Sequence, residues 1–443
     1  MGFALSVLVL LLLVGGLQVF AWYRHRMFAS ALLGTVYLIT YPADLLAVAS
    51  TERAYLSPTI SLSLEGTDVV LSATVSVTLT WIIFSIGMSL LARGRNGNVL
   101  QRGADLVATM RFRPILFVSL VVALTWSVIR VIGEHGVEQT LRLRQAVFGD
   151  DLLSVIAYYA LPVLVPFGLV ALLNIRGFSR TVILAAMGLA LVVTFLTGSR
   201  SGLFLSCVVP VAVLVWRLAG SRRGTLAGDG IRLVTMVATA AAVVLGGAWY
   251  LGEFRDFTAT ESFFASTDLS QADALAAIIG SEFNPAYGAS YVAALGAFIP
   301  RAIWPSKPLP GNVLSSLTVT PERYHLTGAE TTAGLVGEAY LNFGMGAGLV
   351  AGLILVAVAA ICERLLSSAS AEVWILGAVI MLRGVNIVRG DATNVVAPTL
   401  IAIAVWLVIF KRDRSSTGLR GRSLVRSTAR GTPRGDPGEL HKR

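Results

Sequence analysis

The sequence has little charge, only two cysteines and only four histidines. Charged residues make up 14% of the chain and hydrophobic residues 55%, whereas a soluble domain carries about 25% charged residues. Cys207 and Cys362 both fall inside apolar stretches, and the histidines are scattered. The sequence therefore offers neither a disulfide framework nor a Cys/His metal cluster, and we predict no bound metal or cofactor.

The apolar residues occur in blocks of about 20, the length of helix that crosses a bilayer. The first block, 2–23, has no basic segment before it and no A-x-A cleavage site, so we expect a retained span. The pattern predicts an all-α polytopic membrane protein with about eleven transmembrane helices, at 3–22, 27–49, 69–91, 114–132, 152–173, 181–197, 203–219, 232–251, 344–362, 372–388 and 393–410.

The basic residues are mostly arginines in the short connections between spans and in the stretch 411–443, and the net charge is +10. This is the positive-inside pattern, which predicts an outer N-terminus and an inner C-terminus rather than binding to nucleic acid. A composition rich in Arg, Ala and Val is typical of a GC-rich bacterial genome. We therefore expect a multi-pass protein of the bacterial cytoplasmic (inner) membrane.

The predicted topology divides the chain into four parts: eight transmembrane helices in 1–251, a large extracytoplasmic loop in 252–343, three transmembrane helices in 344–410, and a basic disordered cytoplasmic tail in 411–443. Within the loop, 286–304 is moderately apolar. A twelfth span there would break the charge alternation, so we expect an interfacial or re-entrant segment.

The end of the loop carries a polar stripe on an apolar background. Helical phasing places Glu330, Gly334, Glu338 and Asn342 at intervals of four on one face. As one helix, 332–362 would be about 46 Å long, too long for a simple span. Its first half is expected to lie at the outer interface or to line a cavity.

Ionisable side chains inside spans cost free energy and commonly mark a functional site. The predicted topology puts nearly all of them toward the outer ends of their spans: Asp44, Arg130, Arg200, Arg383 and Arg389. A kinked helix beside Pro42 explains Asp44 equally well, and Arg130 is better explained as a snorkelling anchor. Guanidinium groups match phosphate oxygens, so the outer arginines suit an anionic ligand such as a lipid-linked pyrophosphate.

Three motifs carry a family resemblance, in order along the chain. The stretch 196–202 reads L-T-G-S-R-S-G and resembles the T-G-S-R element of the O-antigen polymerase and O-antigen ligase superfamily. The stretch 298–308 resembles the I-P-R-x-x-W-P-x-K-P signature of bacterial oligosaccharide repeat-unit polymerases, the Wzy-like enzymes. The stretch 332–344 resembles the G-E-x-Y-x-N-F-G run of the same family.

The resemblance implies a membrane glycosyltransferase that polymerises polyprenyl-pyrophosphate-linked oligosaccharide repeat units on the outer face. It also implies inversion of configuration without a metal, so arginines would stabilise the pyrophosphate leaving group. The residues expected to bind pyrophosphate or glycan are Arg200, Arg301, Arg389, Arg383 and Asn342. Glu338 and His325 are the two candidates for the base. Expected partners are membrane lipid, a chain-length regulator and a flippase.

Two alternatives stay open at this point. A glycan ligase of the same superfamily shares the chemistry. A flippase or transporter for lipid-linked oligosaccharide would also use arginines, although the inner halves of the predicted spans are almost free of charge. A polyprenyl-phosphate sugar transferase is disfavoured, because its large first outer loop with paired acidic residues has no counterpart in 50–68.

Overall fold

The structure is a computed structural model. It describes residues 2–25, 27–51, 53–57, 60–63, 67–93, 110–142, 148, 152–172, 175, 177–197, 199, 202–203, 205–207, 271–299, 301, 303–327, 330–368 and 370–412. In its first half these residues form α1 (Gly2–Arg24), α2 (Phe28–Leu38), the π-helical turn η1 (Ile39–Ala43), α3 (Asp44–Thr51), β1 (Arg53–Ser57), β2 (Ile60–Ser63), α4 (Thr67–Arg93), β3 (Met110–Phe112), α6 (Pro114–His135), α7 (Val137–Arg142), α9 (Leu152–Leu172) and α10 (Phe178–Leu196).

The second half begins with four short helices: α13 (Gln271–Ile279), α14 (Ala289–Leu295), α15 (Gly311–Val319) and α16 (Pro321–Thr327). They are followed by α17 (Gly334–Phe343), the 3-10 turn η3 (Gly344–Gly346), α18 (Ala347–Leu366), α19 (Ala371–Arg389), α20 (Thr393–Ile409) and β4 (Phe410–Arg412). The described part of the loop thus carries short helices, as predicted.

Eight helices among the described residues are long and apolar enough to cross a membrane: Gly2–Arg24, Phe28–Thr51, Asp68–Ala92, Pro114–His135, Leu152–Leu172, Phe178–Leu196, Gly334–Leu366 and Ala371–Arg389. Each overlaps a predicted span, and the shorter apolar helix Thr393–Ile409 overlaps the last one. The predicted span 232–251 and most of 203–219 lie outside the described residues. The chain is therefore a mostly helical, polytopic membrane protein.

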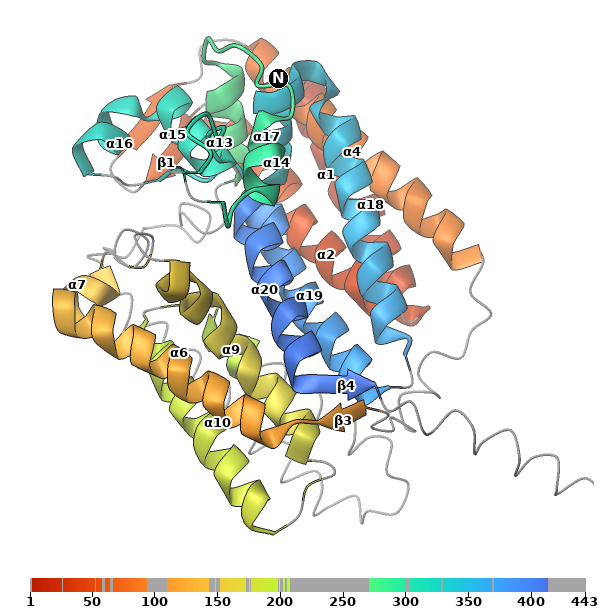
Figure 1. Cartoon of the computed structure of the whole chain (residues 1–443). Helices are drawn as coiled ribbons and strands as arrows, with labels where there is room; N and C mark the ends of the chain where they lie inside the picture. The colour runs from red at the N-terminus through yellow and green to blue at the C-terminus, as the bar shows by residue number, and fades with distance from the viewer. Residues whose placement is uncertain are drawn as a thin grey trace, which may run out of the picture.

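The long helices pack in two groups, each around its own apolar core (Figure 1). One group contains α1, α2, α4 and α18, and the other contains α6, α9 and α10. Helix α19 contacts α2, α18 and α9, so it joins the groups, and α20 packs on α9 and α19. Consequently α19 lies in the interior, and 13 of its 19 residues are buried.

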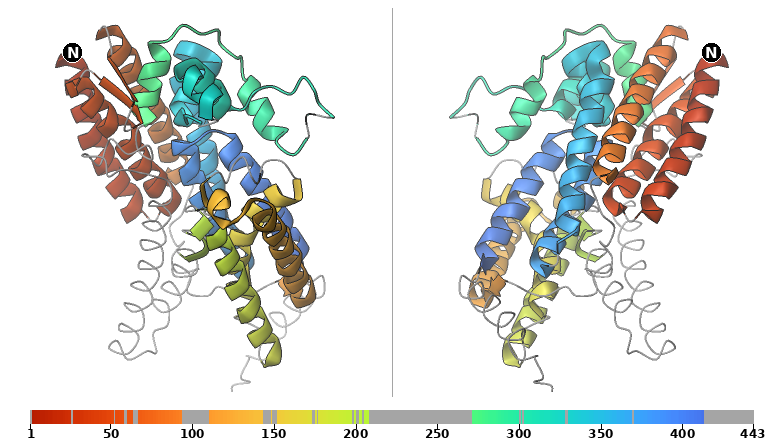
Figure 2. Two further views of the ribbon diagram at one scale, coloured as in Figure 1. Left: turned by 90° about the vertical axis from the view of Figure 1, so that its left-hand side faces the viewer. Right: turned by 90° about the vertical axis from the view of Figure 1, so that its right-hand side faces the viewer.

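The short helices gather at one end of the molecule, beside the N-terminus (Figures 1 and 2). Helix α13 packs against α17, α3, α4 and the hairpin formed by β1 and β2. Helix α14 has only seven residues and is followed by turns, so 286–304 does not form a twelfth span. We call 271–330 the outer segment, after the side of the membrane on which the sequence predicts it.

Two two-stranded antiparallel ribbons depart from the purely helical prediction. One is the β1–β2 hairpin, and the other pairs β3 with β4, which are about 300 residues apart in sequence. Strands of three to five residues carry too little periodicity to be detected beside long apolar helices.

Glycines shape the contact between α4 and α18 and the break between α17 and α18. On α18, a Cβ added at Gly348 would lie 2.7 Å from the Ser76 carbonyl oxygen of α4, and one at Gly352 would lie 2.7 Å from Ile83 Cβ. This small-xxx-small spacing lets the two backbones approach. Gly344 has φ +55°, which ends α17 and separates it from α18. The stretch 332–362 is accordingly two helices, and its first half packs beneath the outer segment.

Candidate functional site

A buried polar cluster lies where α17, α14 and the connection between α19 and α20 meet. Glu338 of α17 is 1% exposed and accepts a hydrogen bond from Ser290 Oγ at 2.6 Å on Oε1 and from the Ala392 amide at 2.7 Å on Oε2. Asn342, one turn along α17, donates to Ser290 Oγ and to the Glu338 carbonyl oxygen, each at 2.8 Å. Glu338 and Asn342 therefore share a face, as the sequence predicts.

Asp391 extends the cluster toward α15. Its Oδ1 accepts the Asn394 amide at 3.0 Å, which caps the first turn of α20, and its Oδ2 accepts the Asn312 amide at 3.3 Å. The Asn312 side chain in turn donates to Glu330 Oε2. We call Glu338, Ser290, Asn342, Asp391, Asn312 and Glu330 the outer polar cluster.

Glu330 reaches this cluster in a different way from the one predicted. The helix begins only at Gly334, whose φ of +65° excludes a continuous helix from 330. The prediction of one stripe from Glu330 to Asn342 is therefore wrong at its first member. Glu330 instead lies on the irregular segment that leads into α17 and meets the cluster through Asn312.

Tyr41 fixes the start of α17. Its ring is fully buried in η1, where Pro42 lacks the N–H that a regular helix needs. The Tyr41 hydroxyl donates to the Val388 carbonyl oxygen at 3.1 Å and accepts the Val336 amide at 3.0 Å. One side chain thus ties η1 to the beginning of α17 and the end of α19.

Asp44 performs a similar task for α13. It is 1% exposed, and its Oδ2 accepts the amides of Ala272 and Asp273 at 2.9 and 3.4 Å, in the first turn of α13. A carboxylate at this position favours the helix N-terminus. Asp44 therefore anchors the outer segment on the membrane helices, a contact that the explanations drawn from the sequence did not include.

The start of α15 covers the carboxyl group of Glu338. A Cβ added at Gly311 would lie 2.5 Å from Glu338 Oε1, so only glycine fits between them. Asn312, the next residue, contacts Asp391 and Glu330. In this conformation the start of α15 covers the outer polar cluster.

Arg383 and Arg389 lie on α19, below and beside the cluster. Arg389 is half-buried at the end of the helix, and Arg383 lies about 9 Å deeper along the axis. Arg383 is 4% exposed, and its guanidinium carbon is 5.9 Å from the centre of the Tyr159 ring of α9. Its Nε and Nη2 atoms have no hydrogen-bond partner in the described part of the chain.

The T-G-S-R-S-G motif ends on the same face of α9. Ser206 Oγ donates to the Pro162 carbonyl oxygen at 3.1 Å, and a Cβ at Gly202 would lie 2.9 Å from Pro162 Cγ. Pro162 and Tyr159 are three residues apart, so they share a helix face. Arg200 itself lies outside the described residues.

Arg301 and His325 are not part of the cluster. Arg301 is exposed, and its guanidinium donates to the carbonyl oxygens of Lys307 at 2.9 Å and Pro308 at 3.4 Å. The motif at 298–308 is therefore a loop held by its own Arg and Lys side chains. His325 is exposed on α16, with its ring 5.9 Å from that of Tyr324.

Burial perturbs the two carboxyl groups that lie outside the spans. Burial raises the pKa of Asp391 above its ordinary value, although the amides of Asn394 and Asn312 act in the opposite direction. Burial also raises the pKa of Glu330; the Asn312 hydrogen bond opposes this and the charge of Asp391 adds to it. A raised pKa makes a carboxylate a stronger proton acceptor.

No metal site is evident within the described ranges, where no three His, Cys, Asp or Glu side chains are placed to hold an ion. The carboxylates of the cluster are held by amide and hydroxyl donors instead. No protein-family model, no curated protein and no solved structure matches this chain.

Sequence reasoning assigned no role to Tyr41, Ser290, Asn312 or Asp391. The Y-P-x-D order at 41–44 and the G-D pair after Arg389 are the signals that could have indicated a polar junction. Neither sequence pattern identifies the distant segment with which its residues make contact.

Proposed function

We propose that this protein polymerises polyprenyl-pyrophosphate-linked oligosaccharide repeat units on the outer face of the cytoplasmic membrane. The observation that carries the proposal is the outer polar cluster, whose buried carboxylates and amides lie at the end of α19 that carries Arg389. The order of the three motifs that resemble the repeat-unit polymerases supports the same chemistry. A transporter path would instead need polar groups along the whole depth of the bundle.

In the proposed reaction, a hydroxyl oxygen of the incoming lipid-linked unit attacks the anomeric carbon of the growing chain. The bond between that carbon and the pyrophosphate oxygen breaks, so the chain moves to the new unit and the lipid pyrophosphate leaves. The proton of the hydroxyl passes to a carboxylate. Atoms and charge balance without any further reactant.

Arg389 and Arg383 are proposed to stabilise the departing pyrophosphate. A guanidinium buried without an anion costs several kcal/mol, and Arg383 Nε and Nη2 have no hydrogen-bond partner among the described residues. A pyrophosphate between α9 and α19 would offset that cost. Arg200 is proposed to contribute from the motif that ends near Pro162 of the same α9 face.

Glu338 is the favoured base, and His325 is the second candidate. Glu338 lies within the cluster, where Ser290 and Asn342 hold its orientation. His325 is on the exposed surface of α16. Access of an acceptor hydroxyl to Glu338 requires α15 to move away from it, since Gly311 covers the carboxyl group.

Glycan length in a deletion strain tests the proposal. The strain should make single capped repeat units with export intact, and the wild-type gene should restore long polymer. Arg389→Ala and Glu338→Gln should fail to restore it at normal protein level. The control is Arg130→Ala, because Arg130 is exposed beside Glu134 at 3.9 Å.

Two other outcomes would reject the proposal. Lipid-linked units that accumulate on the cytoplasmic side would indicate a flippase. Polymer of normal length that is no longer attached to its final acceptor would indicate a ligase.

A further inference from the structure

Two short helices of the outer segment, α14 and α15, flank the carboxyl group of Glu338 on α17 (Figure 1). Ser290 of α14 donates to Glu338 Oε1, and a Cβ added at Gly311 of α15 would lie 2.5 Å from the same oxygen. The two helices also contact each other. Side chains of both helices therefore border the carboxyl group that is the favoured base.

Three buried polar atoms on these two helices have no hydrogen-bond partner among the described residues: Tyr291 Oη on α14, and Asn312 Oδ1 and Ser315 Oγ on α15. Ser315 is fully buried, and Asn312 is 9% exposed. A buried hydroxyl group or amide oxygen without a partner costs free energy. A bound ligand with matching groups would offset that cost.

The two atoms on α15 lie on the side of this helix that covers the outer polar cluster. Ser315 is four residues after Gly311, so the two residues share a helix face. Asn312 donates its side-chain nitrogen to Glu330 and its main-chain amide to Asp391, whereas its Oδ1 accepts no bond from the described residues. Helix α15 thus presents one hydroxyl group and one amide oxygen beside the carboxyl groups of the cluster.

Tyr291 approaches Glu338 from α14. Its ring stacks on that of Phe343, with 6.2 Å between the centroids and 16° between the planes. Burial raises the pKa of Tyr291, and the charge of Glu338 adds to this effect, so the phenol is close enough to Glu338 to interact with it electrostatically. Phe343 thus holds the ring, and the hydroxyl group is available to a ligand.

The chemistry of these atoms selects a neutral ligand that is rich in hydroxyl groups. A hydroxyl group both donates and accepts, whereas an amide oxygen only accepts. An ionised phosphate or carboxylate offers no donor to Asn312 Oδ1, and it would meet the carboxyl groups of Glu338 and Asp391. A hydrocarbon chain would leave all three atoms unpaired. The ring hydroxyls of a sugar supply donors and acceptors at neighbouring positions.

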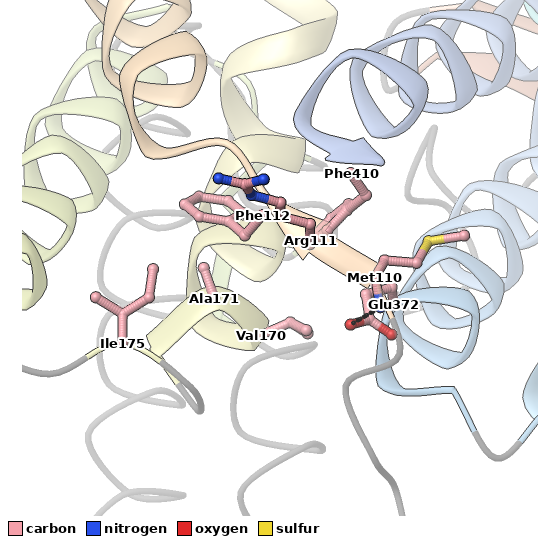
Figure 3. Close-up of a pocket in the computed structure, with 8 residues that line it drawn as sticks. All are labelled: Met110, Arg111, Phe112, Val170, Ala171, Ile175, Glu372 and Phe410. Atoms are coloured by element: carbon pink, nitrogen blue, oxygen red, sulfur yellow. Dashed lines mark hydrogen bonds between the residues drawn. The ribbon is translucent and has the colours of Figure 1, made fainter. Parts of the chain in front are cut away.

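The cavity at the opposite end of the helices has no such unmet groups. It has a volume of about 210 Å³ and lies beside β3 and β4 (Figure 3). The structure describes all 8 residues that line it, and none of them carries a buried side-chain atom without a hydrogen-bond partner. Its Glu372 carboxylate already accepts the Met110 amide at 3.1 Å. The junction of α14 and α15 is therefore the stronger candidate for a sugar site.

We propose that α14 and α15 form the subsite for the acceptor sugar, and that this sugar is neutral rather than a uronic acid. Tyr291, Asn312 and Ser315 would bind its ring hydroxyls and place one of them against Glu338. The sugar would enter after α15 has moved away from Glu338, and the α15 side chains would close over it when the helix returns. The inference rests on the proposed function, because that reaction defines the acceptor.

Thermal unfolding of the purified full chain in detergent micelles tests the subsite, with tryptophan fluorescence as the signal. The probes are the methyl glycosides of glucose, galactose, mannose and N-acetylglucosamine, and methyl glucuronide is the anionic comparison. At least one neutral glycoside should raise the apparent Tm, and methyl glucuronide should not. The glycoside concentration that gives half of the maximal shift should rise about three- to tenfold in Ser315→Ala and in Tyr291→Phe, because each variant loses one hydrogen bond to the ligand.

Ser315 and Ser316 provide a matched pair on α15. Both are fully buried, but Ser316 Oγ donates to the Asn312 carbonyl oxygen and accepts the Thr331 amide, each at 2.7 Å. Ser315→Ala should therefore keep or raise the apparent Tm without a glycoside and weaken glycoside binding. Ser316→Ala should lower that Tm and change the half-maximal concentration by less than about twofold.

The subsite is refuted if no neutral glycoside raises the apparent Tm, if methyl glucuronide raises it equally, or if Ser315→Ala and Tyr291→Phe both bind as the wild-type protein does. Single capped repeat units in the deletion strain, together with no glycoside binding, would overturn the subsite alone. Glycoside binding by a protein whose deletion leaves long polymer unchanged would overturn the proposed polymerase activity and, with it, the assignment of the sugar as the acceptor.

Discussion

The contact between Gly334 and Tyr41 gives a quantitative prediction about how the outer segment is held. Gly334 has φ +65°, and a Cβ there would overlap the Tyr41 hydroxyl. That hydroxyl bonds to the Val388 carbonyl oxygen and to the Val336 amide. Gly334→Ala should therefore cost about 1–2 kcal/mol for the left-handed backbone, plus the energy of the displaced hydroxyl.

The displaced hydroxyl can be measured by itself. Tyr41→Phe removes both of its hydrogen bonds and leaves a buried amide without a partner, which costs about 1–3 kcal/mol. Gly334→Ala should thus cost about 2–5 kcal/mol in the wild-type background and only about 1–2 kcal/mol in the Tyr41→Phe background. The double-mutant cycle predicts a coupling energy of about 1–3 kcal/mol.

Gly344→Ala is the matched control, because Gly344 also has a positive φ, +55°, and nothing lies within 4 Å of its added Cβ. It should cost about 1–3 kcal/mol, because a residue with a side chain rarely adopts its φ of 55° and ψ of −128°, and it should be additive with Tyr41→Phe. The assay is equilibrium unfolding in mixed detergent micelles, followed by tryptophan fluorescence. Additivity of Gly334→Ala with Tyr41→Phe to within about 0.5 kcal/mol would refute the contact.

Three further predictions concern the cluster and the helix packing. Burial raises the pKa of Glu330, so the contribution of its protonated form to stability is greatest below about pH 4 and is lost as pH rises through the raised pKa. The apparent Tm should therefore fall over that pH range, and Glu330→Gln should make the fall smaller. Gly352→Leu should separate α18 from α4 and lower Tm, whereas Gly188→Leu, with open space around its Cβ, should not. Glu338→Gln should lower the free energy of unfolding by about 1–3 kcal/mol, because Gln offers one acceptor oxygen to the two donors, Ser290 Oγ and the Ala392 amide, that the carboxylate accepts; unchanged unfolding would remove Glu338 from the cluster.

The outer polar cluster brings together segments that are far apart in the chain, and this has a consequence for function. Ser290, Asn312, Glu338 and Asp391 come from four elements, and three of these belong to the outer segment or α17. Movement of α15 would break the Asn312 contacts and uncover Glu338 in one step. Substrate entry and exposure of the carboxylate are therefore coupled in the proposed mechanism.

The sequence by itself determined the positions of the described membrane helices and the pairing of Glu338 with Asn342. These features are local: bilayer thickness sets the length of an apolar block, and a helical period of 3.6 sets which neighbours share a face. Charge alternation along the sequence also favoured an interfacial or re-entrant segment over a span at 286–304, and the short helix α14 agrees with that expectation. Such patterns need no knowledge of distant contacts.

Only the tertiary structure decided which polar residues meet. Tyr41 contacts Val336 and Val388, which lie 295 and 347 positions further along the chain. Glu338 contacts Ser290 and Ala392, at sequence separations of 48 and 54. Conversely, the motif residue Arg301 bonds to its own loop, although the sequence grouped it with Arg389. A buried polar atom must find a partner wherever packing brings one, and packing depends on how α19 joins the two helix groups. No local pattern in the chain records that arrangement.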